Sequence, residues 1–175
     1  MKINRRLLEK IDRGKIRLFL IVVALVVILD QLSKLWARAN RPEIELLPGF
    51  LDLVYVENSG AIFGLFHNHT ELFIVLGIVG SILILVFLYF FPPSTSIGMV
   101  PFALILGGAV GNLIDRIRFG YVIDFIGIHL QERFYWPNFN VSDAALVVGI
   151  FALLYYFYKS GVFKKADECS HQPQN

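Results

Sequence analysis

Two aspartates near the C-terminal third of the chain have surroundings that point to acid–base chemistry. Asp124 lies in "GYVIDFIGI", among apolar side chains and with no basic residue within four positions. Such a carboxylate should have a raised pKa or a partner carboxylate that shares its proton. Asp143 opens the apolar run "VSDAALVVGIFALLYYFY". Asn140 or Ser142 can cap a helix there, and spacing alone leaves Asp143 open between a helix-capping and a catalytic role.

Further polar side chains have helical spacing. Asp30 and Lys34 are four residues apart and share a helix face, as an intrahelical ion pair or as part of a site. Asn112, Asp115 and Arg116 also share one face, where they either tie a helix end to a loop or belong to the same site. Polar groups within apolar segments are costly and usually face a bundle interior or a functional cavity.

Other catalytic chemistries find no support in the sequence. No Gly-x-Ser-x-Gly motif, Walker A loop or dinucleotide-binding fingerprint is present. The segment "HNH" at His67 to His69 lacks a third metal ligand. A Ser-His-Asp site would need a histidine near these residues, and His129 follows Asp124 by five residues. The single cysteine, Cys169, cannot form an internal disulfide. An aspartate-based site remains, and we expect neither a metal nor a cofactor.

Composition places these residues in a membrane protein. The 175-residue chain is 56% hydrophobic and 17% charged, with a mean hydropathy of +0.63, whereas about a quarter of a soluble domain is charged. No charged residue occurs in the 43 positions from Leu72 to Ile114, and a spanning helix needs roughly 20. We expect one membrane-embedded domain over residues 1–161 and a disordered tail over residues 162–175.

The apolar runs predict an all-α bundle of four transmembrane helices, with a small β-sheet and loop region on its outer face. The predicted spans are residues 18–36, 72–91, 99–117 and 141–158. "PPSTS" separates the second span from the third, because proline breaks a helix. Small residues in the third span, including Gly107 and Gly108, allow another helix to approach closely.

The distribution of basic residues predicts the topology. Ten of the 16 lysines and arginines lie at the two ends of the chain and six lie in the remaining segments. The positive-inside rule then places both termini in the cytoplasm and the polar residues near the outer face. The basic ends are read as topology signals rather than as a nucleic-acid site. "ARA" at residues 37–39 resembles a signal-peptide cleavage site, but Asp30, Lys34 and the long basic region favour a retained span.

Two segments are expected outside the membrane. Residues 40–71 contain "GFLDLVYVEN", whose alternation predicts a strand, and "AIFGLF", a second strand or a short helix. We expect a small sheet on the membrane surface there. Residues 118–140 are rich in aromatic side chains, which suit the lipid–water interface, and are expected to hold Asp124 in a loop.

Five motifs, in order, resemble those of the lipoprotein signal peptidase family, also called signal peptidase II. They are "DQLSK" at 30–34, "ENSGAIFG" at 57–64, "GGAVGNLIDR" at 107–116, "YVIDFI" at 121–126 and "FNVSDAAL" at 139–146. The resemblance spans nearly the whole chain. It implies an aspartic peptidase of the bacterial inner membrane that cleaves diacylglyceryl-modified prolipoproteins just before the lipidated cysteine.

The resemblance also implies roles for individual residues. Asp124 and Asp143 match the catalytic pair, whose acid and base are not distinguished by the sequence. The substrate-binding or supporting positions are Asn58, Gly60, Asn112, Arg116, Asn140, Asp30, Lys34, Asp115 and Gly108. Ser142 departs from the alanine that is frequent in the family, and it adds a hydroxyl beside the pair.

The resemblance implies partners as well. They are prolipoprotein substrates, membrane lipids and cyclic peptide inhibitors of the family, with the enzyme working as a monomer. We expect the small residues of the third span, including Gly107 and Gly108, to form a substrate channel together with the aromatic residues outside the membrane. The alternatives are a proton- or ion-coupled carrier, since intramembrane carboxylates also mark ion pathways, and a scaffold in which the charges are structural pairs.

Overall fold

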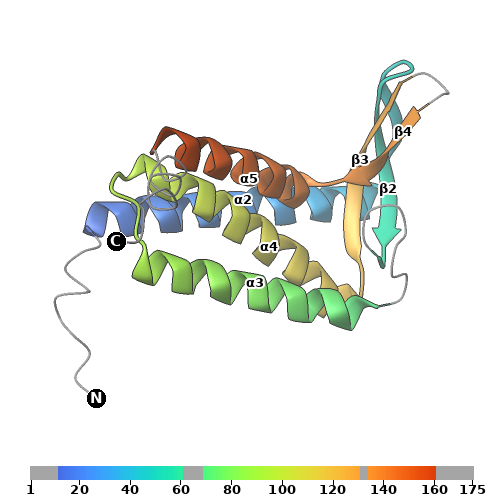
Figure 1. The fold of residues 1–175 in the computed structure, drawn as a ribbon. Helices are drawn as coiled ribbons and strands as arrows, with labels where there is room; N and C mark the ends of the chain where they lie inside the picture. Colours follow the sequence, from blue (N-terminus) through green and yellow to red (C-terminus); the bar gives the residue numbers. More distant parts are fainter. Residues whose placement is uncertain (1–11, 61–68, 131–133, 161–175) are drawn as a thin grey trace, which may run out of the picture.

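Four long helices lie side by side, and a four-stranded sheet covers one end of the bundle (Figure 1). The computed structural model describes residues 12–60, 69–130 and 134–160. The helices are α2 (Arg13–Asn40), α3 (Thr70–Phe90), α4 (Val100–Phe119) and α5 (Val141–Lys159), with a 3-10 turn, η2 (Ile97–Met99), before α4. We call the end of the bundle that meets the sheet the sheet end.

All four helices are long and apolar enough to cross a membrane, and each overlaps one of the four predicted spans. The largest difference in bounds is at α2. Its 28 residues correspond to about 42 Å at 1.5 Å per residue, which exceeds a hydrocarbon core of about 30 Å. The helix extends beyond its predicted apolar core, residues 18–36, at both ends. At its start the Asp12 side chain accepts a hydrogen bond from the Gly14 amide and caps the helix.

The central helix of the bundle is α4. In its most apolar stretch 56% of the residues are buried, against 17%, 6% and 11% for α2, α3 and α5. The glycines of α4 allow α2 and α5 to pack closely against it. A Cβ on Gly107 would lie 2.8 Å from the Val26 Cβ of α2, and one on Gly108 would lie 2.8 Å from the Leu146 Cγ of α5. The expectation that small residues admit neighbouring helices is confirmed.

Two apolar clusters are separated by a polar layer. One cluster lies away from the sheet and contains Phe19, Phe102 and Leu88. The other joins the sheet end of α2 to the sheet through Ala37 with Ile123 and Phe125. The buried positions of α2, in order, are Phe19, Val26, Asp30, Lys34 and Ala37. Two ionisable side chains therefore lie between the two apolar clusters.

The sheet is antiparallel, with the order β1-β2-β3-β4, and stands across the helix axes (Figure 1). Its strands are β1 (Glu43–Leu47), β2 (Leu51–Asn58), β3 (Val122–Leu130) and β4 (Phe134–Phe139). The strand predicted within residues 49–58 is confirmed as β2. The segment "AIFGLF" at 61–66 lies outside the described residues.

The prediction for residues 118–140 was wrong in one respect. The segment contains β3 and β4 rather than a loop, so Asp124 lies on a strand and the sheet is not confined to residues 40–71. The physical reason is long-range pairing. Val122 lies opposite Asn58, and Asp124 lies opposite Val56, so the strand is completed by hydrogen-bond partners more than 60 positions away.

Candidate active site

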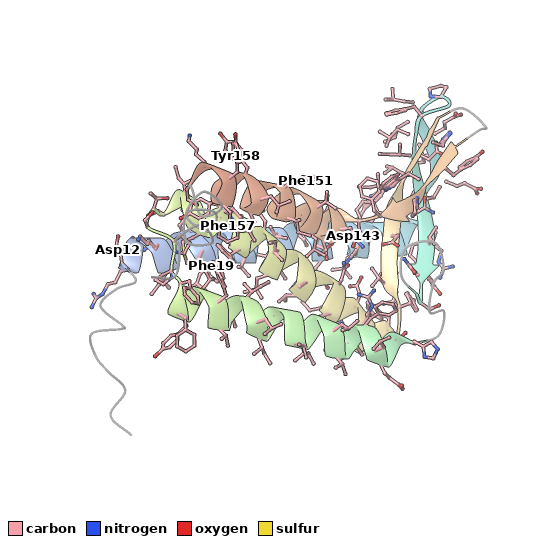
Figure 2. All side chains as sticks on the ribbon, in the orientation of Figure 1. Asp12, Phe19, Asp143, Phe151, Phe157 and Tyr158 are labelled. Carbon is pink, nitrogen blue, oxygen red and sulfur yellow. The ribbon has the colours of Figure 1, made fainter. Side chains whose placement is uncertain are left out.

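Asp124 and Asp143 meet at the sheet end, where α4, β3 and α5 come together. Asp124 is near the start of β3 and is 1% exposed, and Asp143 is in the first turn of α5. Figure 2 shows Asp143 at the end of α5 beside the sheet, with Phe19 and Phe157 toward the opposite end of the bundle. Residues 19 positions apart in sequence thus become neighbours at one site.

Asn140 joins the two aspartates. It is the N-cap of α5: its Oδ1 accepts from the Asp143 backbone N–H at 3.0 Å, and its own backbone N–H donates to Asp143 Oδ2 at 3.2 Å. Its side-chain Nδ2 donates to Asp124 Oδ1 at 2.7 Å. Of the two capping candidates, Asn140 and not Ser142 caps the helix. Because Asp143 takes part in this capping box, its helix-capping role is observed.

Asp124 accepts two side-chain hydrogen bonds, from Asn140 and from Asn58 Nδ2 at 2.8 Å. Burial, followed by the charge of Asp143, raises the pKa of Asp124 to about 7. The two asparagine donors and the charge of Lys34 act in the opposite direction and do not overcome burial. The sequence predicted either a raised pKa or a partner carboxylate for Asp124, and the raised pKa agrees with the first alternative.

A second chain of hydrogen bonds leads from Lys34 to Asp143. Lys34 Nζ donates to Asn112 Oδ1 at 3.0 Å, and Asn112 Nδ2 donates to Asp143 Oδ1 at 2.7 Å. Asn140 Nδ2 also approaches Asn112 Oδ1 at 3.2 Å. The orientation of the Asn112 amide is therefore determined on both sides, so that its donor faces Asp143.

The layer behind the two aspartates consists of Asp30, Lys34 and Asp115, all nearly inaccessible to solvent. Lys34 Nζ lies 2.8 Å from Asp30 Oδ2 and 3.0 Å from Asp115 Oδ2. The predicted Asp30–Lys34 ion pair is confirmed. Lys34 also reaches Asn112, so the pair contacts a residue that donates to Asp143, and its role in the site stays a prediction.

The remaining predicted site residues are more widely placed. The Arg116 guanidinium lies 5.1 Å from the centre of the Phe73 ring and interacts electrostatically with Asp143 and Asp124. The Gly60 backbone N–H donates to Asn58 Oδ1 at 3.1 Å, which orients the Asn58 donor toward Asp124. Neither Arg116 nor Gly60 makes a hydrogen bond to either aspartate in the described part of the chain.

The expected channel along the small residues of α4 is wrong. A Cβ on Gly108 would overlap the Ser142 carbonyl oxygen and a Cβ on Gly107 would press on Val26, so both glycines lie in packed helix contacts rather than on an open face. The sequence indicated close approach correctly, but it did not show which surface approaches.

Ser142, the departure from the family pattern, is fully buried beside Asp143. Its backbone N–H donates to Asp30 Oδ1 at 2.9 Å. No hydrogen-bond partner reaches its hydroxyl oxygen among the described residues. The added hydroxyl thus makes no hydrogen bond to either aspartate there.

Gln31 is a residue that the sequence reasoning missed. Its Nε2 donates to Asp115 Oδ1 at 2.9 Å and lies 3.2 Å from Asp30 Oδ2. Its position beside Asp30 in "DQLSK" was the available signal. Within the described ranges no three His, Cys, Asp or Glu side chains are arranged to hold a metal ion, and His67 and Cys169 lie outside those ranges.

The chain has four potential membrane spans and two buried carboxylates that share an amide donor. This combination indicates a class of membrane-embedded enzymes with an aspartate pair of the kind that aspartic peptidases use. Comparison with known proteins narrows the class. A family model for signal peptidase II matches residues 22–159. The chain belongs to the signal peptidase II family and is a membrane aspartic peptidase.

Individual relatives agree with the family match. A lipoprotein signal peptidase of Moorella thermoacetica is 44% identical over 138 residues, which cover 77% of this chain and 89% of that protein. One of Syntrophotalea carbinolica is 40% identical over 160 residues, covering 87% and 98%.

Solved structures match the fold as well. Two, both described as bacterial membrane enzymes, have TM-scores of 0.74 and 0.70 at 25% and 27% identity. They cover 90% and 79% of this chain, which itself covers 93% and 91% of theirs. The carrier alternative is not supported.

Proposed function

We propose that Asp124 and Asp143 are the catalytic dyad with which this enzyme removes the signal peptide from prolipoproteins. One observation carries the proposal: Asn140 contacts both carboxylates, donating to Asp124 from its side chain and to Asp143 from its backbone. Each aspartate has an additional amide donor, from Asn58 or from Asn112. Both carboxylates are thus oriented before a substrate arrives.

The dyad shares one proton, because two ionised carboxylates in a buried site are costly. The raised pKa of Asp124 supports a proton that the pair holds near neutral pH. We assign this proton to Asp124 in the resting enzyme. Asp143 then takes a proton from the attacking water, while Asp124 polarises the scissile carbonyl and later protonates the leaving amine. The pair titrates as a unit, so its two apparent pKa values belong to both aspartates.

The substrate is a prolipoprotein whose cysteine already carries diacylglycerol, and cleavage occurs just before that cysteine. The lipid keeps the scissile bond at the membrane surface, close to a dyad at one end of a membrane bundle. Arg116 and Asn58, beside the dyad, are suited to bind the polar peptide groups next to the scissile bond. Cyclic peptide inhibitors of the family would occupy the same site.

The enzyme works as a monomer in the bacterial inner membrane, with the dyad near the outer face and both termini in the cytoplasm. The distribution of the basic residues supports this orientation, since ten of the 16 lie at the two ends of the chain.

Cleavage of a diacylglyceryl-modified prolipoprotein peptide by the purified protein in detergent tests the dyad. Asp124→Asn and Asp143→Asn should each lower kcat by at least about a hundredfold, because each removes an acid–base group while keeping the side-chain shape. A chelator should leave the wild-type rate unchanged, because no step uses a metal.

Folding of both variants is checked by their thermal transition in the same detergent. Wild-type activity in either folded variant would exclude this dyad. A wild-type protein that leaves the lipidated peptide intact would contradict the proposed substrate.

A further inference from the structure

Gln31 holds together the two buried carboxylates that stand behind the dyad. We propose that Gln31 is a positioning residue of this peptidase: with Lys34 it ties Asp30 to Asp115 and thereby sets the spacing between Asp124 and Asp143. The inference rests on the proposed catalytic dyad and adds to it a residue that touches neither aspartate.

The two supporting carboxylates act on the backbone next to the dyad. Asp115 Oδ2 accepts the backbone N–H of Ile123 at 3.1 Å, and Ile123 directly precedes Asp124. Asp30 Oδ1 accepts the backbone N–H of Ser142 at 2.9 Å, and Ser142 directly precedes Asp143. Each supporting aspartate thus holds the residue immediately before one catalytic aspartate, and a change in the distance between the supporting pair is passed on to the dyad.

Two side chains of α2 bridge this supporting pair. Lys34 bridges it through Asp30 Oδ2 and Asp115 Oδ2, at 2.8 Å and 3.0 Å. Gln31 bridges it through Asp115 Oδ1 at 2.9 Å and Asp30 Oδ2 at 3.2 Å, and its Nε2 also lies 3.3 Å from the Gly111 carbonyl oxygen. Only Gln31 reaches the second oxygen of Asp115 among the hydrogen bonds of the described residues.

Charge explains why a neutral bridge is needed. Asp30 and Asp115 carry two negative charges against the single positive charge of Lys34, so the carboxylates repel one another unless further donors hold them. Gln31 supplies donors without adding charge. Among the described residues, the other ionisable groups that interact electrostatically with the layer are Arg116 on α4, Asp124 on β3 and Asp143 on α5.

The packing around the layer leaves little room for other arrangements. A Cβ on Gly111 would overlap Ser142 Oγ and would lie 2.6 Å from Asp30 Oδ2. The backbone of α4 therefore lies directly against the supporting pair. Loss of the Gln31 bridge should therefore displace the Asp115 side chain, because Asp115 Oδ1 has no other donor in the described part of the chain.

The spacing of the dyad can be read from its pH profile. Interaction between two carboxylates weakens as their separation grows, and this interaction separates the two apparent pKa values of the pair. The acid and alkaline limbs of the kcat/KM profile report those two values. A looser dyad should bring the limbs together, whereas a loss of folded protein lowers the whole profile without moving its limbs.

The experiment compares Gln31→Met, which keeps the side-chain length without donors, with wild type in the lipidated-peptide assay. We expect kcat to fall by about 10- to 100-fold with KM within about twofold, since small displacements of reacting groups have effects of this size. The two limbs should approach each other by about half a pH unit or more. Ser81→Ala is the matched control, because among the described residues the Ser81 hydroxyl bonds only the Gly77 carbonyl, within α3.

A second variant covers the case in which Gln31→Met does not fold. In Gln31→Glu the introduced carboxyl keeps the shape, repels the supporting pair when ionised and donates one hydrogen bond when protonated. Its activity relative to wild type should therefore rise as the pH is lowered. Wild-type limbs in folded Gln31→Met, or a constant relative activity of Gln31→Glu across the pH range, would overturn the inference. Asp124→Asn in the same assay separates this result from a failure of the proposed dyad.

Discussion

Asp124 shows how a single residue acquires its chemistry from burial. Its neighbours in sequence are apolar, and the fold adds Asp143 together with the amide donors of Asn58 and Asn140. These donors stabilise the ionised form, yet burial dominates and leaves the pKa at about 7. A carboxyl group of this kind can hold a proton near neutral pH and release it during catalysis.

The pH dependence of the wild-type enzyme follows from this shift. The proton that Asp124 holds is present below about pH 7 and is lost above it, so kcat/KM should decline as the pH rises through about 7. Initial rates on the lipidated peptide, with stability of the protein verified at each pH, measure this. An alkaline limb well above this range would contradict a proton that the dyad holds only up to about pH 7.

The same raised pKa favours the folded state at acidic pH, and that contribution is lost as the pH rises through about 7.

At the scale of elements, the site depends on how closely α4 approaches its neighbours. Gly108 lies against the carbonyl of Ser142 and against Leu146, so the first turn of α5, which carries Asp143, is placed by the absence of a side chain on α4. Gly80 on α3 has no atom within 4 Å of the position of a Cβ. These two helical glycines therefore differ in function although both lie in apolar helices.

Gly108→Ala and Gly80→Ala form a matched pair. Gly108→Ala should lower stability by about 1–3 kcal/mol through overpacking, and should reduce cleavage because α5 and Asp143 must shift. Gly80→Ala should be neutral or stabilising by up to about 1 kcal/mol, from helix propensity. Thermal transitions in detergent and cleavage rates measure both effects. Equal stability and activity in the two variants would contradict the packing role of Gly108.

At the scale of the whole molecule, the polar residues are asymmetric along the bundle. The ion pairs and the dyad lie at the sheet end, while the opposite end is packed by Phe19, Phe102 and Leu88. In Figure 1 the first turn of α2 and the last turn of α5 both lie at the end away from the sheet. Under the proposed orientation this end faces the cytoplasm.

The single cysteine tests that orientation in the natural sequence. A membrane-impermeant maleimide should label Cys169 in inverted membrane vesicles and not in intact spheroplasts, because the tail is proposed to be cytoplasmic. Asn40→Cys in a Cys169→Ser background, at the exposed sheet end of α2, should show the opposite pattern. Labelling of Cys169 from outside would reverse the proposed topology.

The sequence by itself determined the four spans and the principal polar residues. Span length and apolar composition are local properties, and a carboxylate such as Asp124 is conspicuous wherever apolar residues surround it. The helical spacing of Asp30 and Lys34 was likewise sufficient to predict their ion pair.

Only the tertiary structure decided how these residues meet. Three contacts join positions 34 or more residues apart. They are the pairing of β3 with β2, the hydrogen bond from Gln31 to Asp115 and the packing of Gly108 against Ser142. Periodicity reports which side chains share a face of one element, but it contains no information on which other element covers that face. The spacing of Asp124 and Asp143 therefore depends on packing and long-range hydrogen bonds that no local pattern specifies.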